Sequence, residues 1–267
     1  MPNFPFQWLN HLAGKLSTQK LPYPLLQKFL KFYVQQYQVN MQESLEPLES
    51  FTQFHDFFTR KIRPELRTID SSSPAIISPV DGKISQYGKI NQGKLIQAKG
   101  KNYSLENLIG KESSPDFQEG NFITFYLSPK DYHRFHAPYA SILKKGISFS
   151  GNFYPVNSWG VRNVDQLFCK NERLLLFLET DHGPMGMLMV GALVVGKIKL
   201  LFEQKMNAGT KVWDPPFAFQ KGEELGYFSL GSTVILLFPK GKMQLSNFTT
   251  DEPIFLGQKI GAWMDAL

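Results

Sequence analysis

Two histidines, His133 and His136, lie three residues apart in the segment DYHRFHAP at positions 131–138, directly after a strand-like run. Imidazole titrates near neutral pH, and loops at strand ends often carry catalytic groups. The spacing would also suit two metal ligands on one helical turn, but no Cys cluster or nearby His-Glu pattern completes such a site. We therefore expect an acid–base site and no metal. The structural alternative is a pair of surface histidines that cap a loop.

Asp81 and Ser232 are the other candidates, and neither is decisive by itself. Asp81 lies in the segment SPVDG at 78–82, where Asp-Gly is first of all a turn signal, although an aspartate at a strand end can also orient a histidine. Ser232 follows Gly231 in the tetrapeptide LGST, which is not the Gly-x-Ser-x-Gly nucleophile elbow. A turn and a strand that begins after a glycine explain both segments without a function.

A β-rich domain must position these residues. From about residue 76, short apolar or alternating runs are separated by glycine-rich turns, and a short helix is predicted at 104–109 with Ser104 as its cap. The pattern predicts an α+β protein with a β-rich, sandwich- or barrel-like catalytic core over residues 46–267. The predicted strands are Ala75–Ile77, Lys83–Tyr87, Leu95–Ala98, Phe122–Leu127, Leu174–Leu178, Met187–Val195, Lys197–Phe202 and Thr233–Phe238.

Residues 1–45 read instead as two amphipathic helices separated by Pro22 and Pro24, with apolar residues at steps of three and four. The region has four lysines and no acidic residue before Glu43. Aromatic, apolar faces with unopposed lysines are typical of helices that lie on anionic lipid. The alternative is a helical hairpin packed on the protein's own core.

Composition favours a folded protein that contacts a membrane without crossing it. The chain has 267 residues, 42% of them hydrophobic, a formal charge of +6 and a single cysteine, Cys169. A disulfide framework within the chain is excluded, which suits a reducing compartment. We see no secretory signal and no apolar run long enough to span a bilayer.

Taken together, the segments resemble the phosphatidylserine decarboxylase family. The resemblance extends from about Phe57 to Pro239 and rests on seven segments in the family's order. These are FFTR (57–60), SPVDG (78–82), YHRFHAP (132–138), NER (171–173), GPM with VGA (183–185 and 190–192), KGEELG (221–226) and LGST (230–233). Residues 152–159 match less closely.

The resemblance implies a proenzyme that cuts its own backbone between Gly231 and Ser232. Asp81, His136 and Ser232 would form the triad for this step, and Ser232 would become a covalent pyruvoyl (pyruvate) cofactor. The new amino-terminal residue would begin a 36-residue α fragment, and the β fragment would end at Gly231. The two fragments would associate as a heterodimer, with a homodimer of these pairs as a further expectation.

The implied reaction converts phosphatidylserine to phosphatidylethanolamine and CO₂, with the pyruvoyl ketone as the electron sink. His133 is then the first candidate for the acid that protonates the carbanion, and His136 the second. His133 and Arg134 are candidates for binding the substrate. We expect a peripheral protein on the cytoplasmic face of a bacterial inner membrane, with an anionic membrane surface as a partner and no nucleic acid.

Two other functions stay open. A serine hydrolase could use Asp81, His136 and Ser232 without cutting its own chain, and a non-catalytic β domain could bind lipid. A pyruvoyl decarboxylase of a soluble amino acid is disfavoured by the lipid-facing amino-terminal region.

Overall fold

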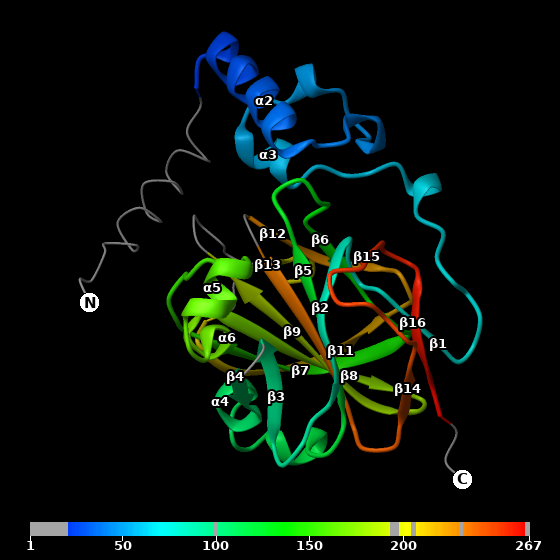
Figure 1. Cartoon of the computed structure of the whole chain (residues 1–267). Coiled ribbons are helices and arrows are strands. Elements are labelled where there is room, and N and C mark those ends of the chain that lie inside the picture. The colour runs from blue at the N-terminus through cyan, green and yellow to red at the C-terminus, as the bar shows by residue number, and fades with distance from the viewer. Residues whose placement is uncertain (1–20, 99–100, 193–197, 204–206, 230–231, 265–267) are drawn as a thin grey trace.

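The computed structural model describes residues 21–98, 101–192, 198–203, 207–229 and 232–264. Its centre is an eight-stranded antiparallel sheet (Figure 1). In spatial order the strands are β11 (Gly209–Phe219), β7 (Ser141–Phe149), β8 (Arg173–Thr180), β9 (Gly183–Gly191), β13 (Ser232–Phe238), β5 (Asn121–Leu127), β2 (Gly82–Lys89) and β15 (Pro253–Ile254).

Three smaller antiparallel sheets complete the β structure. The first contains β1 (Ala75–Ile77), β16 (Lys259–Trp263) and β14 (Met243–Leu245), the second contains β10 (Ile198–Leu200), β12 (Glu224–Phe228) and β6 (Arg134–His136), and the third pairs β3 (Lys94–Ala98) with β4 (Lys101–Ser104).

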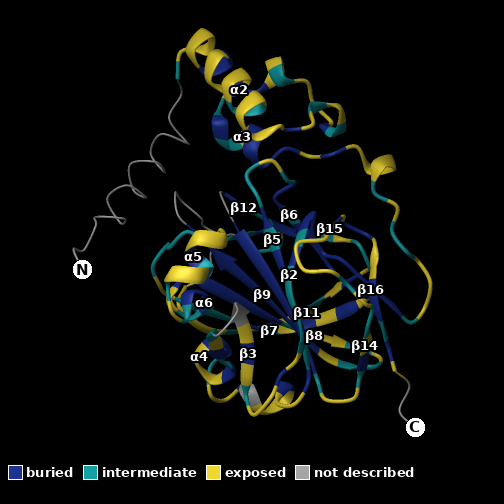
Figure 2. Cartoon of the chain, viewed as in Figure 1, coloured by how far each residue is buried: buried dark blue, intermediate teal, exposed yellow. Residues whose placement is uncertain are grey.

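The central strands of the large sheet, above all β9 and β13, are covered on both faces and are dark in Figure 2. On β13 the side chains alternate, with Val234 and Leu236 in one hydrophobic cluster and Ile235 and Leu237 in the other. The first cluster includes residues of the β1 and β6 sheets, and the second includes α4 (Leu105–Ile109) and α6 (Leu167–Lys170). The predicted α+β, β-rich fold is therefore confirmed.

The described helices also include α2 (Tyr23–Tyr37), α3 (Phe54–Phe58) and α5 (Ser158–Asn163), and short 3-10 turns lie at Met41–Glu43, Leu48–Ser50, Pro64–Leu66 and Ser114–Phe117. The first predicted amino-terminal helix lies outside the described residues. The second is α2, which begins at Tyr23, so that Pro24, expected to lie between the helices, falls in its first turn. Its buried residues share a third cluster with α3 that continues to Phe58, past the boundary expected at residue 45.

Most predicted strands are present within a few residues of their expected ends. The strand predicted at 187–195 corresponds to β9, which begins four residues earlier, at Gly183. The start was misplaced because an apolar run does not reveal where a hairpin turns. Residues 193–195 lie outside the described part of the chain. The cap of α4 is as predicted, since Ser104 accepts a hydrogen bond from the Asn107 N–H at 3.3 Å. Over the described residues, no helix combines the length and the hydropathy that a membrane span requires.

Candidate active site

Ser232 is the first residue of β13 and lies in the middle of the large sheet. It pairs with Leu127 of β5 on one side and with Gly191 of β9 on the other. Its side chain is fully buried, and Oγ has no hydrogen-bond partner among the residues that the structure describes. A buried hydroxyl without a partner costs free energy, so the position calls for an explanation beyond packing. Gly231 lies outside the described residues.

His133 is also buried and partly unpartnered. It lies between β5 and β6, its ring centroid is 4.0 Å from that of Phe58 in α3, and its backbone carbonyl accepts from the Phe228 N–H at the end of β12. Nδ1 lies 2.8 Å from the carbonyl oxygen of Asp131, which can only accept, so Nδ1 carries the hydrogen. Nε2 is then an unprotonated nitrogen that has no partner in the part of the chain that the structure describes. Burial lowers the pKa of His133 to about 3, which keeps the ring neutral at pH 7.

His136 has both ring nitrogens engaged. Nδ1 is 2.8 Å from the Gly222 carbonyl oxygen and so carries the hydrogen, while Nε2 accepts from the Tyr132 hydroxyl at 3.0 Å. Burial is the main cause that lowers the pKa of His136, against the charges of Glu224 and Asp81, which raise it. The KGEELG segment thus supplies the carbonyl that fixes the tautomer of this histidine.

Asp81 is buried, but the structure does not join it to His136. Its carboxylate accepts from Arg67 Nε at 3.0 Å and Nη2 at 2.6 Å, and from the backbone N–H of Leu256 at 2.8 Å. Arg67 Nη2 also bonds Glu43 at 2.8 Å. In the part of the chain that is described, no hydrogen bond connects Asp81 with His136 or Ser232. The aspartate of the expected triad therefore acts on His136 here only through its charge.

Arg134 is largely engaged by the protein. Its Nη1 pairs with Glu224 at 2.6 Å and its Nε donates to the Thr59 carbonyl at 2.8 Å, with the guanidinium 5.4 Å from the Tyr227 ring centroid. The FFTR, YHRFHAP and KGEELG segments are thus connected through one side chain. Within the described part of the chain, no hydrogen bond engages Nη2, which leaves this donor for another group.

Three functional contacts were missed by sequence reasoning: Arg67 on Asp81, Tyr132 on His136, and the Gly222 carbonyl. Tyr132 and Gly222 lie in segments that the resemblance had already marked, but nothing in the spacing shows which atoms meet. Gly222 has a φ of 83°, and a Cβ there would lie 3.1 Å from the Ile69 side chain, so glycine is needed to present this carbonyl. Arg67 carried no sequence signal.

Asn171, in the NER segment, braces the strand partner of Ser232. Its Nδ2 donates to the carbonyls of Gly191 at 2.8 Å and Tyr154 at 2.9 Å, and its Oδ1 accepts from the Tyr154 N–H at 2.9 Å. Asn171 is fully buried. It therefore ties the loop at 152–157 to the end of β9, beside Ser232.

We expect Asn171→Ala to lower the free energy of unfolding by about 2–4 kcal/mol, because one buried and two half-buried backbone groups lose their partner. The measurement is urea unfolding of chains that also carry Ser232→Ala, which would block the self-cleavage expected at this position. Asn163→Ala is the matched control, since Asn163 is exposed and makes one bond to its own helix. Equal stabilities for the two variants would show that this contact is not a structural brace.

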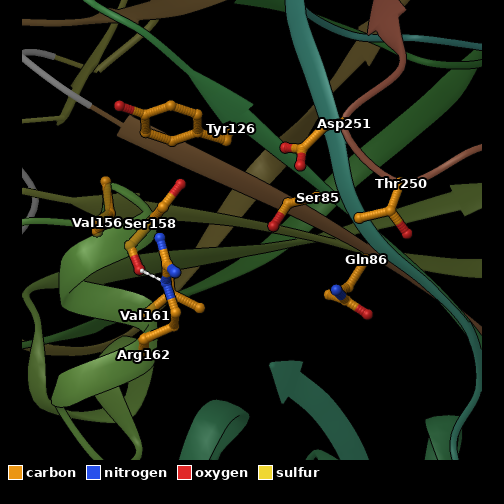
Figure 3. A pocket seen from close by; sticks show the side chains of 9 residues that line it. All are labelled: Ser85, Gln86, Tyr126, Val156, Ser158, Val161, Arg162, Thr250 and Asp251. Atoms are coloured by element: carbon orange, nitrogen blue, oxygen red, sulfur yellow. Dashed lines mark hydrogen bonds between the residues drawn. The ribbon is translucent and has the colours of Figure 1, made fainter. Parts of the chain in front are cut away.

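A cavity of about 290 Å³ opens on the α5 side of β5 (Figure 3). Tyr126, which pairs with Thr233, lines it together with Ser85, Ser158 and Arg162. Arg162 donates to the Ser158 carbonyl at 3.0 Å. The cavity thus combines hydroxyl groups with one cation and the carboxylate of Asp251, next to the strand that begins at Ser232.

No metal centre is present among the residues described: no three His, Cys, Asp or Glu side chains gather as a possible ligand set. The polar groups of the site suit proton transfer and nucleophilic attack instead.

Comparisons with known proteins show which family the chain belongs to. A family model described as phosphatidylserine decarboxylase matches residues 54–262. The chain is 39% identical over 264 residues to a phosphatidylserine decarboxylase proenzyme of Marinobacter nauticus, covering 95% of this chain and 92% of that protein. It is 40% identical over 255 residues to the proenzyme of that name from Escherichia coli O9:H4, covering 90% of this chain and 79% of that protein. The chain belongs to the phosphatidylserine decarboxylase family.

Proposed function

We propose that this chain cuts itself between Gly231 and Ser232 and then decarboxylates phosphatidylserine to phosphatidylethanolamine and CO₂ at a membrane surface. The observation that carries the proposal is the buried, unpartnered hydroxyl of Ser232, the residue after a glycine at the start of a central strand. The proenzyme names of the relatives support the same reading.

Self-cleavage needs only the chain and one water. Ser232 Oγ attacks the Gly231 carbonyl carbon while its proton passes to a base, and the peptide bond is exchanged for an ester. Removal of the Ser232 α-proton then breaks the ester C–O bond, which frees the Gly231 carboxylate and leaves dehydroalanine. Addition of water and loss of ammonia give the pyruvoyl group.

His136 is the proposed base for self-cleavage, acting at Nε2. The Gly222 carbonyl holds the ring in the tautomer that leaves Nε2 able to accept, and Tyr132 must yield its place there to the Ser232 hydroxyl. The negative charge of Asp81 favours the protonated ring of His136. A triad aspartate has the same effect on its histidine, although Asp81 forms no hydrogen bond with this ring.

The fragments would stay together after cleavage. β13 is hydrogen-bonded between β5 and β9 and is buried at every position. Downstream, β16 pairs with β1 and β15 pairs with β2. The α fragment thus supplies a central strand and two further pairings to the β fragment, which supports a tightly held heterodimer.

The pyruvoyl group would supply the electron sink for decarboxylation. Ser232 fits its formation, because a buried hydroxyl without a partner is free to be consumed without loss of a structural hydrogen bond. His133 remains the proposed acid–base group of the decarboxylation, because its Nε2 has no hydrogen-bond partner among the described residues. Arg134 Nη2 is the proposed contact to the headgroup phosphate.

The membrane surface is proposed to bind α2. One face of this helix packs on the protein through Leu26 and Leu30, whereas Phe32 is 61% and Leu25 54% exposed, and two lysines lie between them (Figure 2). Interfacial helices combine these features. Tyr33 of α2 also donates to the Pro129 carbonyl at 3.1 Å, so the helix touches the loop that carries His133.

We expect the double variant Lys28→Glu/Lys31→Glu to bind vesicles of phosphatidylcholine with phosphatidylglycerol at least about tenfold more weakly, because each basic residue contributes about 1 kcal/mol at an anionic surface. Co-sedimentation measures the binding. Lys240→Glu/Lys242→Glu, in the turn between β13 and β14, is the charge-matched control. Equal losses from both pairs would place the membrane contact elsewhere.

The function itself is tested by incubating the purified protein with phosphatidylserine vesicles and measuring CO₂ and phosphatidylethanolamine. Both products are expected in equal amounts. A serine hydrolase would instead keep its chain intact and react with a fluorophosphonate, and a lipid-binding domain would bind the vesicles without releasing CO₂.

A further inference from the structure

A second cavity, of about 230 Å³, lies where the α2–α3 region meets the β core. We call it the junction cavity and define it by its charged lining residues, which are Arg60, Arg67, Lys83, Lys130, Glu43, Asp81 and Asp131. Ser232, His133 and His136 do not line it, but Asp81 and Tyr132 do, so the cavity borders the proposed catalytic groups on their Asp81 side.

The three carboxylates that line the junction cavity already have hydrogen-bond or ion-pair partners within the protein. Glu43 and Asp81 both form ion pairs with Arg67, so these carboxylates and the charge of Arg67 compensate one another. Asp131 accepts from the Ser128 N–H at 2.6 Å and from its hydroxyl at 2.7 Å, and burial is the main cause that raises the pKa of Asp131. None of the three contacts the other cations within ion-pair distance.

Arg60 is therefore a buried cation without a carboxylate contact. It is only 5% exposed, and its two terminal nitrogens donate to the backbone carbonyls of Phe57 at 3.4 Å and Lys130 at 2.9 Å. Its Nε is buried and has no partner. Burial lowers the pKa of Arg60, which reflects the cost of keeping this charge out of water. An anion held nearby would offset that cost.

Lys83 and Lys130 add two more positive charges. Lys83 lies on β2, Lys130 lies on the β5–β6 loop, and neither forms an ion pair with a described residue. Three cations thus face one cavity from three separate segments. That arrangement suits a compact anion with several acceptor oxygens more than a planar carboxylate.

We propose that the junction cavity binds a phosphate group through Arg60, Lys83 and Lys130. The source is either the headgroup of an anionic membrane lipid or free inorganic phosphate, since both present the same oxygens. The position of the cavity beside the α2 region places a lipid phosphate within the proposed docking side of the molecule. Phosphate binding in this cavity does not depend on the proposed function, whereas a lipid source rests on the membrane contact proposed for α2.

The test uses the full-length Ser232→Ala chain, so that binding is measured without cleavage. One arm records thermal unfolding with inorganic phosphate against chloride at equal ionic strength. The other records it with vesicles of phosphatidylcholine, with and without phosphatidylglycerol. Ligand bound to the native state alone is expected to raise the Tm by about 2–4 °C at concentrations several times Kd.

Lys83→Gln/Lys130→Gln is expected to abolish the rise, and Lys83→Arg/Lys130→Arg to retain it. Lys240→Gln/Lys242→Gln is the control with the same loss of charge. A rise in the phosphate arm identifies a free-anion site, and a rise only with phosphatidylglycerol identifies a lipid site. If neither arm shows a rise that the Lys83/Lys130 pair controls, the proposal is overturned, and the decarboxylase assignment is untouched.

Discussion

Ser232→Ala is expected to leave the chain whole and to remove decarboxylation to the uncatalysed background. The methyl group cannot attack the Gly231 carbonyl, so neither the ester nor the pyruvoyl group forms. The fold should persist, because Oγ makes no hydrogen bond that the variant would lose. Gel electrophoresis and CO₂ release measure the two effects.

Thr233→Val is the matched control for this variant. The Thr233 hydroxyl is also buried without a partner, one residue along the same strand, and valine has nearly the same shape. We expect Thr233→Val to split normally and to decarboxylate at a rate close to that of the natural chain. Cleavage in Ser232→Ala, or an equal block in Thr233→Val, would contradict the role given to Ser232.

His133→Asn is expected to split normally but to decarboxylate about 10²–10⁴-fold more slowly, which is the usual contribution of a positioned acid–base group. The reason is that His133 Nε2 is buried, neutral and unpartnered, whereas the base for cleavage is assigned to His136. His136→Asn is the comparison and should block splitting. The roles would be reversed if His133→Asn stayed whole and His136→Asn split.

The same residue predicts a pH dependence of stability. The pKa of His133 lies at about 3 in the folded chain, below the ordinary value of 6.5 that the unfolded chain has. The unfolded state therefore binds more protons between these values, and stability falls as the pH drops from about 6.5 towards 3. His133→Asn should flatten this dependence in urea unfolding, and an unchanged slope would show that His133 is not the neutral buried ring described here.

The parts of the fold that followed from sequence are those governed by local rules. The cap at Ser104 and the strand β1 depend on neighbouring residues, and both are as predicted. The long strands β7 and β11 were not predicted, and the reason again lies in the residues of the strands themselves. β7 contains adjacent lysines and a glycine, and β11 contains two prolines with a break in register between Val212 and Phe217, which weakens any strand pattern.

The candidate site was predicted in its residues but not in its contacts. The ordered segments singled out Asp81, His136 and Ser232, yet the partner of Asp81 is Arg67, and the partners of His136 are Tyr132 and Gly222. Gly222 lies 86 positions from His136 in the chain, so only the strand pairing of β12 with β6 brings them together. Contacts of this kind depend on topology, which residue types and spacing do not encode.

Intact-mass spectrometry of the purified natural chain tests the central claim most directly. We predict two components, with the smaller beginning at position 232 as a pyruvoyl group and ending at Leu267. Their summed mass should equal that of the intact chain plus one water minus one ammonia, whereas simple hydrolysis would add one water and lose no ammonia. A single intact chain, or a small fragment that begins with unmodified serine, would contradict the account.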